Sequence, residues 1–483
     1  MAILTVWKGS SRCDVEFQPP QRLDPLLNQI GYLADRPCGG RGTCGKCKVR
    51  IRTQLSERQA EDHLRCQTVL TGDCEVWLPE DTGLPSVEKA VPETGFHTVS
   101  LGAAIDIGTT TIAVALYDLD TGNSLSECMA NNPQRSVSAD VMGRIQAALT
   151  GSGQMLQDQV LAGLKRLLIN ACELAGCRIE YLQRMVIVGN TTMLYLLLGR
   201  SPESLATAPF HADDLFGREE VVLSHPVLLP PCMTAFVGAD TTAAVLASGM
   251  CRHGETSMLC DIGTNGELAL WKNGTLYVTS TAAGPALEGA QITCGCSSIP
   301  GAIDKVWWEN DALAIHTIDG QPAVGICGSG LIDAVAVLLQ QEIMDETGAL
   351  DADVTLAAGV TLLQKDIRAL QLAKAAIAAG IQTLLDSTGT TCGEIETFYL
   401  AGGFGSHLNL ANAAAIGLIP EKLVEKTKVI GNAALAGAAR LLLDPAATKE
   451  IRAIAERSRH FNLGGNPVFN GNYMEQMLFP FIE

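Results

Sequence analysis

Four cysteines near the N-terminus constrain what the first part of this chain can fold into. They follow the order C-x5-C-x2-C-x18-C, at Cys38, Cys44, Cys47 and Cys66, and four glycines lie between residues 39 and 45. Three thiolates on one glycine-rich loop and a fourth further along are the arrangement that holds a [2Fe–2S] cluster. Glycine lets the backbone wrap closely around the cluster sulfides and donate N–H groups to them. We therefore expect the four cysteines to ligate a [2Fe–2S] cluster.

Two other roles for these cysteines are weaker. A four-cysteine zinc site usually shows two close pairs, and only Cys44 and Cys47 form a close pair here. A disulfide framework requires an oxidising compartment, and the sequence shows no secretory signal. The cluster is therefore the favoured interpretation, and zinc is the main alternative.

The residues around the cysteines predict a small domain over residues 1–80. This pattern resembles the β-grasp fold of plant-type and adrenodoxin-type ferredoxins, with one residue more between the first two cysteines than in the plant spacing. The resemblance implies an α+β ferredoxin-type domain. The expected elements are strands at Ile3–Trp7 and Asp14–Phe17, a helix at Pro25–Gly31, and strands at Cys47–Ile51 and Cys74–Leu78.

The length and composition of the chain allow about two to four domains with large cores. The 483 residues are 47% hydrophobic, which is enough for several packed domains. A formal net charge of −18 argues against nucleic acid or an anionic membrane as partner, and no apolar run is long enough to cross a bilayer. Sixteen cysteines without a secretory signal indicate a reducing cytoplasm. Residues 81–100, rich in Pro, Glu, Gly and Ser, are expected to form a linker.

A strand–turn–strand motif occurs twice in residues 101–483. The first copy is an apolar strand, then Asp106-Ile-Gly-Thr-Thr-Thr111, then a second, alternating strand. The second copy has the same layout around Asp261-Ile-Gly-Thr-Asn265. Two copies of one unit predict a duplicated, two-lobed domain with a cleft between the halves. We expect lobe I at about 101–255 and lobe II at about 256–483.

The chemistry of these turns suits a nucleotide. A Gly-Thr turn offers N–H groups and hydroxyls to phosphate oxygens, and an aspartate at each strand end can hold Mg²⁺ directly or through water. A third element, the strand and glycine turn from Phe398 to Ser406, would let an adenine ring approach the backbone. In this order the motifs resemble the phosphate-1, phosphate-2 and adenosine motifs of the acetate kinase/sugar kinase/heat-shock chaperone/actin superfamily, which implies an RNase-H-like, actin-like ATPase that uses ATP and Mg²⁺. The expected nucleotide contacts are Gly108, Thr109, Thr110, Thr111, Gly263, Thr264, Asn265, Gly402, Gly403, Phe404 and Gly405, with Asp106 and Asp261 as catalytic Mg²⁺ ligands.

Five residues near these motifs have both a structural and a functional interpretation. Asn190 and Thr191 either approach the nucleotide, as the first connecting segment of the superfamily does, or cap the helix that follows them. Asp240 either orients the attacking water or caps its own helix. Gly284 and Glu288 follow the second phosphate motif and are expected to border the nucleotide.

The two halves of the chain together closely resemble the reductive activators of corrinoid proteins, which join an N-terminal [2Fe–2S] domain to an actin-like ATPase. Besides the motifs above, the resemblance rests on Thr-Cys294-Gly, on Ile-Cys-Gly-Ser-Gly-Leu-Ile-Asp333 and on the tail from Asn466 to Pro480. It implies ATP-dependent transfer of one electron from the cluster to cob(II)amide, which gives cob(I)amide for a methyltransferase system. Longer members carry a further middle domain. Here the linker runs directly into Leu101, so we expect a short member that lacks this domain.

The same resemblance implies the partners. They are a corrinoid protein of a methyltransferase, O-demethylase or corrinoid iron–sulfur system, an upstream low-potential electron donor, and a second copy in a homodimer. Two other functions remain open. The chain could be an ATP-gated electron donor to a non-corrinoid metalloenzyme, as the dehydratase activators are, or a small-molecule kinase with an accessory redox domain.

Overall fold

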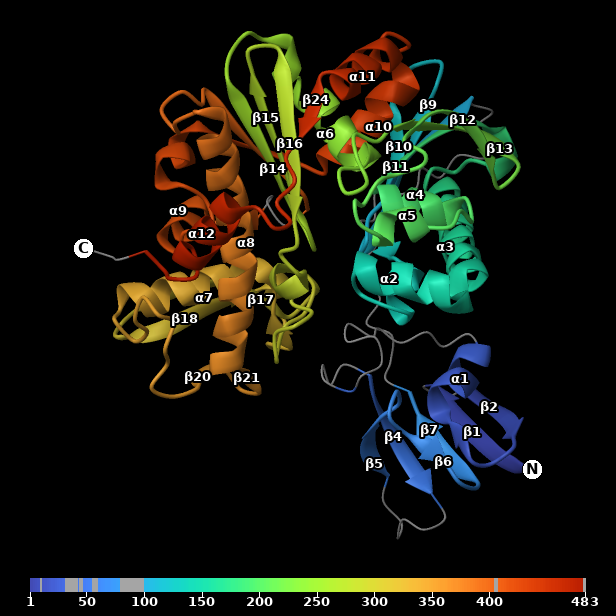
Figure 1. Ribbon diagram of the computed structural model, residues 1–483. Coiled ribbons are helices and arrows are strands. Elements are labelled where there is room, and N and C mark those ends of the chain that lie inside the picture. Colours follow the sequence, from blue (N-terminus) through green and yellow to red (C-terminus); the bar gives the residue numbers. More distant parts are fainter. Residues whose placement is uncertain are drawn as a thin grey trace.

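The computed structural model describes residues 1–8, 11–30, 42, 47–53, 60–78, 100–403 and 407–480. Within these ranges the protein is a mixed α/β structure with three main sheets, one near the N-terminus and two larger ones in the remainder (Figure 1). Apart from Ser100, the predicted linker 81–100 lies outside the described residues.

The N-terminal sheet has five strands in the order β2-β1-β7-β4-β5. β1 pairs antiparallel with β2 and parallel with β7. The helix α1 (Leu23–Gln29) buries Leu23, Leu26 and Leu27, which the helical period places on one face. The expected strands and helix are therefore confirmed. The strands are β1 (Ala2–Lys8), β2 (Ser11–Phe17), β4 (Lys48–Thr53), β5 (Glu61–Leu64) and β7 (Cys74–Trp77), with a small ladder of β3 (Gln21–Arg22) and β6 (Val69–Leu70).

The second sheet has six strands in the order β10-β9-β8-β11-β13-β12. β8 pairs antiparallel with β9 and parallel with β11, and its first five residues are all buried. Such a run is typical of a strand that is covered on both faces. The strands are β8 (Leu101–Ile107), β9 (Thr111–Asp118), β10 (Ser124–Asn131), β11 (Leu182–Gly189), β12 (Phe216–Val222) and β13 (His225–Pro231), and the helices are α2 (Val141–Ala147), α3 (Gly153–Leu174), α4 (Thr191–Leu197), α5 (Glu203–Ala206) and α6 (Ala239–Ser248).

The third sheet repeats the layout of the second. Its order is β23-β22-β14-β15-β16-β24, so that β16-β15-β14-β22-β23 corresponds to β10-β9-β8-β11-β13 in order and in strand direction. The duplication that the repeated motif predicts is therefore present in the topology. The strands are β14 (Ser257–Ile262), β15 (Gly266–Lys272), β16 (Thr275–Thr281), β22 (Thr397–Ala401), β23 (Thr427–Gly431) and β24 (Ser458–His460).

Helices and short strands complete the second half. Helix α7 is buried from residue 328 to residue 339. No helix in the part of the chain that the structure describes is long and apolar enough to span a membrane. The remaining elements are β17 (Ala302–Glu309), β18 (Ala312–Thr317), β19 (Gly325–Ile326), β20 (Val354–Ala357), β21 (Val360–Leu362), α7 (Gly328–Gln340), α8 (Gln364–Thr388), α9 (Leu410–Ala415), α10 (Ala433–Leu443), α11 (Ala447–Glu456) and α12 (Pro467–Glu475).

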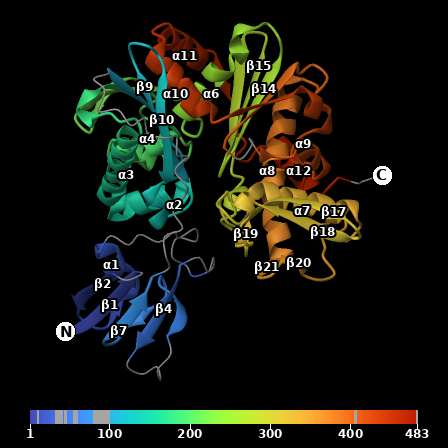
Figure 2. The same cartoon turned by 180° about the vertical axis from the view of Figure 1, so that it is seen from behind.

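Helices α6 and α10 lie between the two large sheets (Figures 1 and 2). A Cβ atom at Gly437 of α10 would lie 2.1 Å from the carbonyl oxygen of Ala243 in α6, so the two helices touch backbone to backbone. α10 also packs on β8 and β11, although it follows the second repeat in sequence. The C-terminal part of the chain thus contributes to the core of the first half.

Residues 477–479 pack against helix α8, and the first two of them are hydrogen-bonded to it. The ammonium of Lys374 donates to the carbonyl of Leu478 at 2.5 Å, and the amide of Gln371 donates to the carbonyl of Met477 at 2.9 Å. The ring of Phe479 is 3% exposed, and its centroid lies 5.2 Å from the Lys374 ammonium. Lys374 itself is fully buried.

Candidate functional site

The two Asp-Ile-Gly-Thr turns meet at the ends of β8 and β14. The hydroxyl oxygens of Thr110 and Thr264 lie 3.2 Å apart, although 154 residues separate them in sequence. Both hydroxyls donate to one carboxylate oxygen, Glu288 Oε2, at 2.6 and 3.0 Å respectively. Glu288 is the last residue of the 3₁₀ helix η5 (Pro285–Glu288), and Gly284 precedes this helix with a φ of 76°. The duplicated turns and Glu288 therefore converge on one place.

Each turn is closed by a backbone hydrogen bond. The N–H of Gly108 donates to the carbonyl of Thr111 at 2.9 Å, and the N–H of Gly263 donates to the carbonyl of Asn265 at 2.9 Å. The second turn is one residue shorter than the first, because Ile262 pairs with Gly266 where Ile107 pairs with Ile112. The two turns are thus closed by the same kind of backbone hydrogen bond, but the second is one residue shorter.

The difference in length changes the chemistry of the second copy. In the β8–β9 ladder Asp106 lies opposite Ala113, whereas in the β14–β15 ladder Asp261 lies opposite Glu267. Directly opposed residues on antiparallel strands place their side chains on the same face of the sheet. The second copy therefore carries two neighbouring carboxylates where the first carries one.

These carboxylates raise the pKa values of one another. Burial, and after it the charge of Asp240, raises the pKa of Asp106 to about 8. The side-chain amide of Asn432 donates to Asp106 Oδ2 at 3.2 Å, which acts in the opposite direction and lowers this pKa. Burial and the charge of Asp240 raise the pKa of Asp261 to about 7. Burial likewise raises the pKa of Asp240, and the pKa of Glu267 rises through burial and the charges of Asp240 and Asp261. A cation would relieve this repulsion.

The donor set fits Mg²⁺ in character. Mg²⁺ usually keeps several waters and takes one or two protein carboxylates, and Asp106 and Asp261 are the carboxylates at the two strand ends. Within the described ranges, no three His, Cys, Asp or Glu side chains are grouped closely enough to hold a metal ion by themselves.

A fully buried arginine, Arg144 of α2, supports the first turn. Its guanidinium donates to the carbonyl of Thr109, to the carbonyl of Ser138 at 3.0 Å and to Gln134 Oε1 at 3.2 Å. The amide of Asn132 donates to the carbonyl of Gly108 at 2.8 Å. These bonds fix the carbonyls of Gly108 and Thr109, which are successive in the turn. Because each carbonyl shares a planar peptide unit with the next N–H, the bonds also fix the direction of the N–H groups that follow.

Asn190 has both of the roles considered from the sequence. Its side-chain oxygen accepts from the N–H of Met193 at 3.0 Å and caps α4, while its amide donates to the hydroxyl of Thr109 at 3.0 Å. The neighbouring Thr191 is fully buried, and its hydroxyl donates to the carbonyl of Thr234 at 2.7 Å. Asn190 thus links the start of α4 to the first turn, whereas Thr191 is used within the fold.

Asp240 lies in the first turn of α6 and close to the strand ends. Its carboxylate accepts from the N–H of Thr241 at 2.7 Å. The preceding Gly238 lets α6 approach α4, because a Cβ there would lie 2.4 Å from the Cα of Asn190. Together with its effect on the pKa of Asp106 and Asp261, this places Asp240 beside the two motif aspartates.

The third motif adjoins the second turn. β22 runs parallel to β14, and Ala401 pairs with Asp261. Gly402 has a φ of 95°, and a Cβ there would lie 2.7 Å from Asp261 Oδ1, so only glycine fits this position. Among the residues that the structure describes, no atom lies within 4 Å of a Cβ at Gly403. Phe404 and Gly405 lie outside the described residues.

Two of the four predicted cluster ligands lie within the described residues. The side chains of Cys47 and Cys66 are both buried, and each is 3% exposed. The N–H of Arg65 donates to the carbonyl of Cys47 at 3.0 Å, which holds both cysteines at the same end of the β4–β5 ladder. Cys38 and Cys44 lie outside the described residues.

The surroundings of Cys66 suit a closely wrapped loop. Gly42 has a φ of 78°, and a Cβ there would lie 2.9 Å from Gln67 Cγ, so Gly42 lies directly against the residue after Cys66. On the other side, the guanidinium of Arg65 forms a buried ion pair with Asp24 of α1, at 2.5 Å. Buried thiols beside a glycine-rich segment fit a cluster ligated by cysteine.

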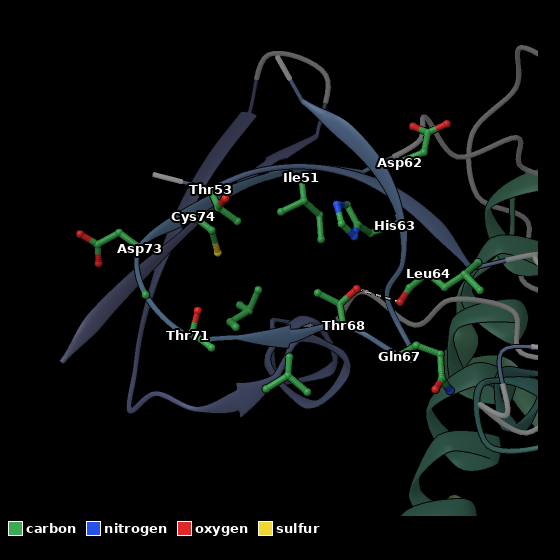
Figure 3. Close-up of a pocket in the computed structure, with 13 residues that line it drawn as sticks. Ile51, Thr53, Asp62, His63, Leu64, Gln67, Thr68, Thr71, Asp73 and Cys74 are labelled. Atoms are coloured by element: carbon green, nitrogen blue, oxygen red, sulfur yellow. Dashed lines mark hydrogen bonds between the residues drawn. The ribbon is translucent and has the colours of Figure 1, made fainter. Parts of the chain in front are cut away.

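A cavity of about 730 Å³ lies next to this region, between β4, β5 and the segment from β6 to β7 (Figure 3). The side chains of His63 and Cys74 point into it (Figure 3). Burial raises the pKa of Cys74 to about 11, so this thiol is protonated at neutral pH. The sequence carried no signal for the cavity, which depends on the spacing of strands distant in sequence.

Three residues of the candidate site were not predicted. Glu267 could have been found by writing out the register of the second hairpin, which places it opposite Asp261. Asn432, which caps α10 and contacts Asp106, carries only the general signal of a helix-capping residue. Arg144 carries no local signal, because its partners come from separate segments of the chain.

Comparisons with known proteins cover most of the chain. The C-terminal domain of RACo, the ASKHA domain, matches residues 255–483, and the RACo middle region matches residues 101–253. "Corrinoid activation enzyme RamQ" of Eubacterium limosum is 33% identical over 435 residues, which cover 82% of this chain and 72% of that protein. A "[Co(II) methylated amine-specific corrinoid protein] reductase" of Methanosarcina barkeri is 26% identical over 422 residues, which cover 78% and 77%. A solved structure, "Reductive activator for corrinoid,iron-sulfur protein", matches 100% of this chain and 99% of its own at 26% identity and a TM-score of 0.74.

One expectation from the sequence is wrong. The chain does not lack a middle domain, because residues 101–253 match the RACo middle region. The internal repeat explains the error. Both halves carry the same strand–turn–strand motif and the same strand order, so both were assigned to one ATPase domain that follows the linker.

Proposed function

The chain belongs to the RACo family of corrinoid protein activators, and on that premise we propose that it is an ATP-dependent reductase of a corrinoid protein. In the proposed reaction one electron passes from an N-terminal [2Fe–2S] cluster to cob(II)amide and gives cob(I)amide for a methyltransferase system. The printed names of the two relatives, a corrinoid activation enzyme and a corrinoid protein reductase, support this activity.

The observation that carries the ATP half of the proposal is the meeting of Thr110 and Thr264, 3.2 Å apart. Two Gly-Thr turns from separate halves that converge in this way suit one phosphate chain held from both sides. In the proposal the N–H groups and hydroxyls of both turns bind phosphate oxygens. Asp106 and Asp261 hold Mg²⁺ directly or through water, and Asp240 positions the attacking water.

The adenine ring is assigned to the third motif. Gly402 and Gly403 adjoin the second turn, and the open space at Gly403 supports approach of a flat ring to the backbone. Asn190, through Thr109, and Glu288, through both turns, then border the phosphates. Thr191 is assigned a supporting role, because its hydroxyl is bound to Thr234.

The redox half is assigned to Cys38, Cys44, Cys47 and Cys66 as cluster ligands. A cluster bound there would supply one-electron transfer at a low potential, near −400 mV for the plant type, as an order of magnitude. The burial of Cys47 and Cys66 supports ligation rather than exchange with solvent thiols. Because the nucleotide would bind between two halves of the chain, its binding can bias their arrangement and couple ATP to electron transfer.

The remaining assignments complete the proposal. They are a ferredoxin-type domain at 1–80, a linker at 81–100, and two halves at about 101–255 and 256–483, of which the first matches the RACo middle region and the second the ASKHA domain. The proposed partners are a corrinoid protein and an upstream low-potential electron donor, and the proposed assembly is a homodimer in the cytoplasm.

The test uses the purified full-length protein with its cluster reduced. It is mixed with a cob(II)amide-loaded corrinoid protein, with and without Mg-ATP, and the visible spectrum is followed. We expect cob(I)amide only when ATP is present. An absence of any ATP-dependent change with every cognate corrinoid protein would contradict the proposal.

A matched pair of variants tests the two halves separately. Cys66→Ser should abolish reduction and leave nucleotide binding intact, because the thiol lies in the N-terminal domain. Cys13→Ser, which replaces an exposed thiol of the same domain, should change neither. Loss of both reduction and nucleotide binding in Cys66→Ser would mean that the N-terminal domain and the nucleotide-binding part of the chain do not function as separable units.

A further inference from the structure

We propose that the carboxylate of Glu288 occupies the phosphate-binding hydroxyls of Thr110 and Thr264 and that a nucleotide must displace it in order to bind. We call this carboxylate, bound to the two hydroxyls, the clasp. The inference rests on the proposed function, because it assumes that ATP phosphates bind between the two turns. It assigns Glu288 a role opposite to that of a nucleotide ligand.

The argument begins with the number of available hydrogens. A threonine hydroxyl has one hydrogen and can therefore donate one strong hydrogen bond. Thr110 donates its hydrogen to Glu288 Oε2 at 2.6 Å, and Thr264 donates to the same oxygen at 3.0 Å. A phosphate oxygen needs the same hydrogens. Carboxylate and phosphate therefore exclude each other at these two hydroxyls.

The backbone around Glu288 is held in place by packing. Phosphate can therefore replace the carboxylate only if the Glu288 side chain rotates away. Ala286 and Leu287 of η5 are each 1% exposed. Gly289, with a φ of 73°, donates its N–H to the carbonyl of Ala286 at 3.0 Å, and a Cβ there would lie 2.6 Å from the carbonyl oxygen of Cys296. The glutamate side chain has three rotatable bonds, which is enough to swing the carboxylate away without moving η5.

The charge of Glu288 opposes the proposed ligand. Its second oxygen, Oε1, lies 3.9 Å from the Cβ position of Gly263, so the carboxylate spans the entrance of the second turn. The carboxyl groups of Asp106 and Asp261 also lie at the strand ends. A polyphosphate that enters must meet the Glu288 carboxylate as well, and like charges at this separation repel.

The clasp also joins the two halves of the chain. Thr264 and Glu288 belong to the second half, and Thr110 belongs to the first, so the bond from Thr110 to Glu288 crosses between them. Displacement of the carboxylate by phosphate breaks this crossing bond and replaces it with bonds from both turns to one ligand. The clasp therefore makes the contact between the halves depend on the nucleotide.

The experiment measures the Kd of the full-length protein for Mg-ADP and Mg-ATP by calorimetry. Glu288→Gln keeps the size of the side chain and removes its charge, and a neutral acceptor holds the hydroxyls less strongly. We expect Glu288→Gln to bind both nucleotides about tenfold more tightly than wild type. Glu309→Gln removes an exposed carboxylate of β17 in the same half and should leave the Kd unchanged.

An unchanged or weakened affinity of Glu288→Gln would overturn the proposal, because Glu288 would then be neutral or a ligand of the nucleotide. If Glu288→Gln does not fold, the nucleotide Kd of Glu288→Asp tests the proposal instead. Its carboxylate is too short to reach both hydroxyls, so it should also bind more tightly, and unchanged or weaker binding would again overturn the clasp. A wild-type protein that binds neither nucleotide would instead contradict the proposed function.

Discussion

The buried Lys374 predicts a pH dependence of stability that one substitution should remove. Burial between α8 and the tail lowers the pKa of Lys374 from 10.5 to about 8. Below pH 8 the lysine is charged in the folded and the unfolded states, and the folded state bears the full cost of burying that charge. As the pH rises from 8 toward 10.5, the folded protein loses this proton before the unfolded chain does. The free energy of unfolding therefore rises over this range.

The size of the effect follows from the two pKa values. Linkage gives a destabilisation of about 3.3 kcal/mol at pH 7 and about 0.8 kcal/mol at pH 10, a difference of about 2.5 kcal/mol. The carbonyl of Leu478 and the ring of Phe479 stabilise the charged ammonium and reduce this difference. About 2.5 kcal/mol is therefore its upper limit.

The assay compares urea unfolding of the wild type and Lys374→Met at pH 7, 8.5 and 10. The free energy of the wild type minus that of the variant should rise with pH by up to about 2.5 kcal/mol. Groups that titrate in both proteins, such as the buried cysteines, cancel in this difference. Lys365→Met, an exposed position on the same helix, should give a difference independent of pH. A difference that is flat or falls with pH in Lys374→Met would refute the reasoning.

Three further predictions concern the two halves and their site. Arg144→Met leaves the carbonyls of Thr109, in the first turn, and Ser138 without their buried donor, at about 1–3 kcal/mol for each carbonyl. It should weaken Mg-ATP binding at least about tenfold in calorimetry, whereas Arg166→Met on the exposed face of α3 should not. Gly437→Ala forces a Cβ to 2.1 Å from a carbonyl of α6 and should lower stability by about 2 kcal/mol in urea unfolding. Gly471→Ala, in α12 with nothing within 4 Å, should not destabilise, and equal losses in both variants would contradict close helix packing. Removal of Mg²⁺ with EDTA should weaken ATP binding more than tenfold, because the site carboxylates then face the phosphates without a cation, and equal affinity with and without Mg²⁺ would count against the assigned ligands.

The strands and turns were predictable because they depend on short-range pattern. The apolar alternation and the two Asp-Ile-Gly-Thr turns place β8, β9, β14 and β15 correctly, and the duplication predicted a two-lobed arrangement with one turn from each half. The contact of Thr110 with Glu288 spans 178 residues and depends on how η5 packs, which no local pattern encodes.

The same limit explains two other misses. The buried arginine of α2 has partners at Thr109 and in the segment from Gln134 to Ser138, so its role emerges only when the helix is packed. The middle region was misassigned because a repeated motif marks a shared topology and cannot say how a family divides its domains.

The packing of α10 has a consequence for how the chain is made. Leu435, Ala438 and Leu441 are buried in the same core as the strands β8 and β11. A nascent chain that emerges from the ribosome with its N-terminus first must expose that apolar face until residues 433–443 have been synthesised. Folding of the first half is then completed only after residues 433–443 have emerged, and residues 101–255 made alone should aggregate unless residues 256–483 are supplied alongside them.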